Sequence, residues 1–330
     1  MLHIHDGDST AETAKKANIP GEHLAWREAL VYGPSPSGLS DEQFMDLRAS
    51  HLAHAYGVKT EQCKAELRAQ HDAINNFSDH EEVVLWFEHD LFCQVNLIYL
   101  LGKFAQRELG ATRLSLVCIG DFPGVEHFRG LGQLNEEQLA SLFPARTEIT
   151  KAQLELGSKA WAAYSAADAV KLLALLDADT SALPFLEPAL VKHLQRFPST
   201  TNGLSRIGNV GLELIDQGYR KFKSLFPAFG RREPVYGFGD AQLYLELKRL
   251  ADVRTPVLTL SSFGNPAPMN AAQILLSSFE ITEHGRAVLS GDEDFIRSNG
   301  IDLWLGGVHL KGKEAQWRWD EQGQELLVSL

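Results

Sequence analysis

The sequence predicts an α/β protein whose N-terminal part is a Rossmann-like parallel sheet with helices on both faces. In the first 125 residues, four short apolar runs alternate with stretches of helical spacing. That alternation is typical of parallel strands joined by helices. The run at 81–90 has five successive apolar residues between charged ones, which indicates a strand buried on both faces of the sheet.

The elements of this part follow from local signals. Ser9 or Thr10, with Glu12 as the acidic partner, would cap the first helix, and Ser40 would cap the next. Residues 32–39 are rich in Gly, Pro and Ser and predict a loop. The glycines expected to end helices are Gly57 and Gly110. The expected strands are 2–5, 22–28, 81–90 and 113–121, and the expected helices are 9–17, 40–57, 60–76 and 91–110.

Three units are expected along the chain. Residues 1–130 form the Rossmann-like domain, 131–184 a helical connector, and 185–330 a second domain. The second domain combines helices with a closing β-hairpin, which is the outline of a winged-helix-like α+β domain. Its clearest helix is 239–252, with leucines at core spacing. The expected caps of the helices after residue 130 are Asn135, Thr150 and Ser165.

Composition indicates a protein that is not membrane-embedded. Hydrophobic residues make up 44% of the 330 residues, enough for a sizeable core. No apolar stretch approaches the roughly 18 residues of a membrane-spanning helix. The N-terminus lacks the basic and apolar pattern of a signal peptide. We therefore expect a cytoplasmic protein, in which Cys93 and Cys118 are buried apolar side chains.

Charge is distributed unevenly. The formal net charge is −12, of which −11 lies in residues 1–186 and −1 in residues 187–330. Nucleic-acid contacts need cations at the phosphates, so the acidic half disfavours a nucleic-acid partner. The near-neutral half leaves that partner open, because its basic residues gather at 219–233.

Ionisable side chains follow each of the four predicted strands. The carboxyl ends of parallel strands meet at one edge of a sheet, and ligands bind there. We therefore expect these side chains to form one site. They are His5, Asp6 and Asp8 after the first strand, Arg27 and Glu28 after the second, Glu88, His89 and Asp90 after the third, and Asp121 after the fourth.

An anion site is the first chemistry that this edge could support. Gly7, Asp8, Ser9 and Thr10 lie where a strand turns into a helix, and backbone N–H groups at a helix N-terminus bind phosphate. Arg27 could add a bidentate clamp on the anion. The same residues are also ordinary turn and capping residues, and this structural interpretation stays open.

A divalent metal and general acid–base catalysis are the other two chemistries. Asp6, Asp8 and Glu88 are carboxylates that suit magnesium or manganese. For acid–base work, the candidates are His5, Glu88, His89 and Asp90, with each histidine tuned by neighbouring carboxylates. Asp90 is equally suited to be only the N-cap of the following helix.

Several of these motifs together resemble a known bacterial family. The chain has Gly7-Asp8-Ser9, then Trp26-Arg27-Glu28 and Gly33-Pro34, and later Trp86 with Glu88, His89, Asp90 and Gln94 in "LWFEHDLFCQ". In this it is similar to members of the family catalogued as domain of unknown function 1835. The resemblance covers nearly the whole chain and implies that the strand-end residues share one site. One departure is "LSRIG" at 204–208, where longer members tend to have "LSRTE".

Two functions from different classes therefore remain. The first is a small-molecule-binding protein, a hydrolase or transferase, with a phosphate- or nucleotide-like ligand or a metal at the strand ends. The second is a ligand-sensing regulator or adaptor whose C-terminal half binds DNA or a protein. The charge distribution favours the first.

Overall fold

A five-stranded sheet forms the N-terminal part of the fold. The structure is a computed structural model and describes residues 1–261 and 270–328. The strand order is β2-β1-β4-β5-β6, with the first four parallel and β6 antiparallel to β5. The α/β class with a mostly parallel N-terminal sheet is thus confirmed. The strands are β1 (Leu2–His5), β2 (Glu22–Ala25), β4 (Glu82–Glu88), β5 (Arg113–Ile119) and β6 (Thr147–Glu148).

Helices cover both faces of this sheet. One face packs on α4 (Leu91–Ala105), α6 (Lys151–Tyr164) and α8 (Leu186–Leu194), and the other on α1 (Asp8–Lys16) and α5 (Glu136–Leu142). Every residue of β4 is buried, which confirms the prediction for the run at 81–90. The remaining helices of this part are α2 (Asp41–Tyr56), α3 (Thr60–Asn75) and α7 (Val170–Leu176).

Most predicted helix ends are confirmed. Ser40 caps α2 in a full capping box, and Gly57 follows α2 in the left-handed conformation. Asn135 and Thr150 cap α5 and α6, and Asp90 caps α4 through the amide of Cys93.

Other predicted ends were wrong. Helix α1 starts at Asp8, after Gly7 with φ 105°, and no side chain caps it. Ser9 and Thr10 therefore lie inside the helix. Ser165 ends α6, because its hydroxyl donates back to the carbonyl of Trp161. Helix α4 stops at Ala105, well before Gly110.

Within the described residues, the C-terminal part combines helices with two hairpins and one further antiparallel pair of strands that are well separated in the sequence. One hairpin had been predicted at the end of the chain, and the structure has two there, β9–β10 and β11–β12. The helices are α9 (Arg206–Asp216), α10 (Phe222–Arg232), α11 (Asp240–Ala251), α12 (Ala271–Leu276), α13 (Glu283–Ser290) and α14 (Phe295–Asn299), with the 3-10 turn η4 (Pro234–Tyr236) before α11. The strands are β7 (Leu258–Ser261), β8 (Ser278–Ile281), β9 (Ile301–Gly306), β10 (Val308–Gly312), β11 (Trp317–Asp320) and β12 (Glu325–Val328).

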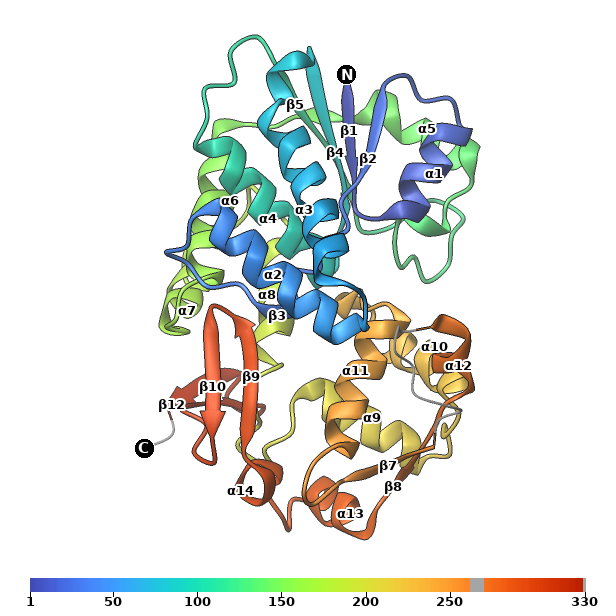
Figure 1. The fold of residues 1–330 in the computed structure, drawn as a ribbon, viewed down its shortest axis with the longest axis vertical. Helices are drawn as coiled ribbons and strands as arrows, with labels where there is room; N and C mark the ends of the chain where they lie inside the picture. Colours follow the sequence, from blue (N-terminus) through green and yellow to red (C-terminus); the bar gives the residue numbers. More distant parts are fainter. Residues whose placement is uncertain (262–269, 329–330) are drawn as a thin grey trace.

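The two parts of the chain share one core. The predicted loop 32–39 contains a short strand, β3 (Gly33–Pro34), which pairs with β9. Arg196 donates to the carbonyl of Val31 at 2.6 Å, and Tyr164 donates to that of Leu30 at 3.1 Å. Figure 1 shows β1 running from the N-terminus toward the C-terminal elements, so the carboxyl ends of the parallel strands face them. The boundaries at 130 and 184 stay a prediction.

No helix within residues 1–261 and 270–328 has the length and apolar character needed to cross a bilayer.

Candidate functional site

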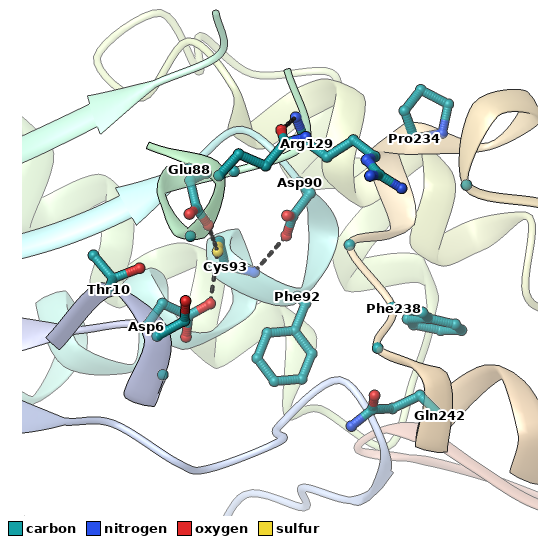
Figure 2. Close-up of a pocket in the computed structure, with 18 of the residues that line it drawn as sticks. Asp6, Thr10, Glu88, Asp90, Phe92, Cys93, Arg129, Pro234, Phe238 and Gln242 are labelled. Atoms are coloured by element: carbon teal, nitrogen blue, oxygen red, sulfur yellow. Dashed lines mark hydrogen bonds between the residues drawn. The ribbon is translucent and has the colours of Figure 1, made fainter. Parts of the chain in front are cut away.

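A cavity of about 700 Å³ lies between the strand ends and the segment from α10 to α11 (Figure 2). Its lining brings together residues that are far apart in the sequence. On the sheet side it is lined by seven of the predicted site residues: Asp6, Gly7, Asp8, Ser9, Thr10, Glu88 and Asp90.

The opposite wall was not predicted. It is mainly aromatic and glycine-rich, with Gln242 as a polar group (Figure 2) and Glu233, paired with Lys192 and Arg206, as a charged one. The sequence holds a faint signal for it, the Gly-Phe-Gly run at 237–239, which allows close backbone approach. The phenylalanines around the cavity are Phe92, Phe226, Phe229 and Phe238.

Three carboxyl groups gather around the thiol of Cys93 on the sheet side. The Cys93 Sγ lies 2.6 Å from Asp6 Oδ2 and 2.5 Å from Glu88 Oε2. The Cys93 amide donates to Asp90 Oδ1 at 2.8 Å, and Asn96 Nδ2 donates to Asp6 Oδ1 at 2.9 Å. We refer to Asp6, Glu88, Asp90 and Cys93 as the acid cluster.

The acid cluster retains protons near neutral pH. Burial raises the pKa of Asp6 to about 6 and the pKa of Asp90 to about 7. Burial, followed by the charge of Asp90, raises the pKa of Glu88 well above its usual range. A thiol has one hydrogen, so Cys93 cannot donate to both Asp6 and Glu88. At least one carboxyl must carry a proton for both short contacts to be favourable.

Cys93 is itself a poor nucleophile in this environment. Burial raises the pKa of its thiol well above the ordinary value, and the nearby carboxylates add to the effect. The reactive species of a cysteine is the thiolate. Cys93 is therefore a neutral hydrogen-bonding group, and the carboxyls are the groups of the acid cluster with pKa values closer to neutral pH.

The N-terminus of α1 opens on the same cavity. Among the residues that the structure describes, no side chain accepts a hydrogen bond from its first turn, so backbone N–H groups there are available to a ligand. Asp8 does not occupy them, because its carboxylate accepts bidentate hydrogen bonds from Arg27 at 2.6 to 3.0 Å. This arrangement suits an anion.

Arg27 lies outside the main cavity. It is engaged by Asp8, and the pair is about half exposed. Its hydrogen bonds hold the pKa of Asp8 below its usual range. A cation that does line the cavity is Arg129, which sequence reasoning had not selected. No carboxylate among the residues that the structure describes pairs with Arg129.

Glu28 is structural. Its carboxylate accepts from Arg48 at 2.5 and 2.8 Å, and both side chains are buried. Arg48 also donates to the carbonyls of Ala29, Tyr32 and Pro34. The pair fastens the segment after β2 to α2 and takes no part in the cavity.

His5 points to the other face of the sheet, into a buried histidine cluster with His3 and His23. Trp86 Nε1 donates to His3 Nδ1 at 3.0 Å, so His3 donates through Nε2 to the carbonyl of Pro20 at 3.1 Å. His23 Nε2 donates to the carbonyl of Ile19 at 3.0 Å, so its Nδ1 accepts from His5 Nε2 at 2.9 Å. These bonds assign one tautomer to each neutral ring.

Neutrality of these rings has a clear cause. Burial lowers the pKa of His3 to about 4 and that of His5 to about 2. His5 therefore stabilises the α1 face of the sheet and lies apart from the acid cluster.

His89 lies beside the main cavity, in a neighbouring one. Its ring packs near Phe128 and Phe185, and burial lowers its pKa. Asp121, after β5, is exposed and lines neither cavity.

Two groups of side chains have metal-ligand spacing within the described residues. One is His3, His5 and His23, whose ring nitrogens already bond to one another and to backbone. The other is Asp6, Glu88 and Cys93, with ligand atoms within 4.8 Å. Of the predicted ligands, Asp6 and Glu88 are together, whereas Asp8 is held by Arg27. A thiol in the set suits softer ions than magnesium or manganese.

Comparison with protein-family models and with curated proteins finds no match for this chain. The resemblance to the family named above stays a prediction, and the chemistry of the site is argued from its geometry.

Proposed function

We propose that the protein binds a phosphorylated, nucleotide-like small molecule in the 700 Å³ cavity and transfers a proton to or from it through the acid cluster. One observation carries the proposal: the cavity joins proton-holding carboxyls, an uncapped helix N-terminus and an aromatic wall. Each of the three suits a different part of such a ligand.

The phosphate end would lie at α1. Its first turn offers unpaired backbone N–H groups and the positive end of the helix dipole. Gly7, at φ 105°, lets the backbone turn there with no Cβ in the way. Arg129, on the same cavity, supplies a full positive charge.

The aromatic end would lie against the phenylalanines. Phe92 and Phe238 face the cavity with Gln242 beside them (Figure 2). Stacking on aromatic rings stabilises a nucleobase by about 1–3 kcal/mol. A volume near 700 Å³ lies within the usual range for small-molecule sites, about 300–1,000 Å³.

The chemistry follows from the raised pKa values. A carboxyl group that holds a proton near pH 7 can donate it to a leaving group, and afterwards take one back as a base. Glu88 and Asp90 are the candidates because both line the cavity and their pKa values are raised further than that of Asp6, which is about 6. Hydrolysis and group transfer are the reaction classes that need such a donor.

No observation favours the regulator function to the same degree. Helix α9, which begins within the "LSRIG" segment at 204–208, has most of its residues buried, and this leaves little of it to contact DNA. Arg232 of the basic segment 219–233 is paired with Glu213. A nucleic-acid partner, and membership of the family that the sequence resembles, are proposals with less support.

The proposal is tested by calorimetry and thermal shift with nucleoside phosphates and inorganic phosphate, with and without EDTA. A bound ligand at about 100 times its Kd should stabilise the fold by roughly 2.7 kcal/mol. Glu88→Gln keeps the side-chain shape and should retain binding while losing product formation, followed by phosphorus NMR. Asp121→Asn, on the same rim but outside the cavity, is the matched control and should behave as wild type. Absence of stabilisation by every nucleotide would reject the proposal.

A further inference from the structure

A second cavity, of about 400 Å³, adjoins the first. The two share Arg129, Gln133, Gly230 and Pro234 in their linings. They are therefore neighbouring chambers on either side of the same short segments, the loop before η2 (Leu131–Gln133) and the end of α10.

The second cavity is basic, in an acidic protein. Arg129 and Arg231 both line it, with His89 and His127. Neither arginine forms an ion pair within the described ranges, although most other arginines do. The opposing charge in this lining is Glu126. Two guanidinium groups against one carboxylate leave a net positive chamber that suits an anion.

Arg129 stands where the two cavities meet. Its backbone amide donates to Gln133 Oε1 at 2.5 Å, which holds the turn that carries it. Two residues on, the amide of Leu131 donates to the carboxylate of Glu88. This loop thus joins the acid cluster of the first cavity to the cationic lining of the second. In Figure 2 the Arg129 side chain extends past Asp90 toward Pro234.

We infer that the second cavity is an anion subsite, and that the ligand is a nucleoside diphosphate or triphosphate whose terminal phosphate occupies it. This inference rests on the proposed function, because the nucleoside part is assigned to the first cavity. Arg129 contacts the inner phosphate and Arg231 the terminal one. A monophosphate would fill the first cavity alone.

The test compares the affinities of nucleoside mono-, di- and triphosphates of one base by titration calorimetry. We expect wild type to bind the triphosphate about tenfold more tightly than the monophosphate, as one added arginine–phosphate contact would give. Arg231→Ala should lower the affinity for the triphosphate to that for the monophosphate and leave the affinity for the monophosphate unchanged. Arg231→Glu should weaken the triphosphate further.

Arg232→Ala is the matched control, since Arg232 is the next residue but pairs with Glu213 and lines neither cavity. It should change no affinity. Equal binding of all three nucleotides, or equal weakening of all three by Arg231→Ala, would overturn the subsite alone. Failure of every nucleotide, the monophosphate included, would overturn the proposed function with it.

Discussion

The backbone of Gly237 lies against the carboxylate of Asp90, so closely that a Cβ at position 237 would overlap the carboxylate oxygens. Asp90 lies just after β4, as the N-cap of α4, and Gly237 follows η4 in the C-terminal part. Their contact closes one side of the cavity. It also accounts for much of the burial that raises the pKa of Asp90 to about 7.

Gly237→Ala should therefore destabilise the protein by more than its backbone conformation alone requires. Gly237 has φ +63°, which costs an alanine roughly 1 kcal/mol. Overlap with Asp90 should add about 1–3 kcal/mol. The control is Gly110→Ala, at φ +58° with open space around it. Urea unfolding of both variants measures the difference, and equal losses would contradict the close contact.

Asp90→Asn should flatten the pH dependence of stability. The pKa of Asp90 is raised in the folded state, so the folded protein binds the proton more tightly than the unfolded chain. Wild type should then lose stability as the pH rises from about 4 through about 7, by roughly 3 kcal/mol for this group. Asparagine keeps the helix cap and does not titrate. The free energy of unfolding is measured at several pH values, and Asp121→Asn, at an exposed position, is the control. If Asp90→Asn kept the wild-type pH dependence, as the control should, the buried proton of Asp90 would be contradicted.

His5→Leu should change how the stability of the protein depends on pH at acidic pH. The lowered pKa values of His3 and His5 mean that the unfolded chain takes up protons below pH 6.5 that the folded protein refuses until about pH 4 or lower. Stability therefore falls as the pH drops through this range. Removing one such histidine should reduce the slope by up to about 1.4 kcal/mol per pH unit. An unchanged slope in urea unfolding between pH 4 and 6 would show that His5 is not buried neutral.

Glu28→Ala should be among the most damaging single changes outside the cavity. It would leave Arg48, which is fully buried, without its counter-charge. Breaking a buried pair costs about 3–5 kcal/mol. Glu42→Ala, which removes an exposed partner of Arg68, should change the free energy of unfolding by less than about 1 kcal/mol. Similar losses for the two variants would refute a structural role for Glu28.

The parts of the fold that were predicted correctly depend on local signals. The apolar run of β4 and the caps Ser40, Gly57 and Asp90 can each be predicted from a few neighbouring residues. The convergence of Asp6, Glu88 and Asp90 followed from one topological rule, that parallel strands end on the same edge.

What was missed depends on contacts between distant segments. Nothing in the sequence near Phe238 or Arg129 marks them as neighbours of the strand ends, although Phe238 lies 148 residues after Asp90 and Arg129 lies 39 residues after it. His5 was misjudged for a different reason. Both faces of β1 are buried, so alternation along the strand gave no sign of which face held the site.

The contact between Gly237 and Asp90 also couples the conformation of the cavity to the pKa values of its carboxyl groups. Any conformer in which residues 226–242 move away from the strand ends would hydrate the acid cluster and let its carboxyls ionise at neutral pH. Opening must then release protons, and by the same linkage a rise in pH must favour the open form. Entry of a ligand and the ionisation of the groups that act on it are thus coupled events. Measuring the protons released during ligand binding would detect both.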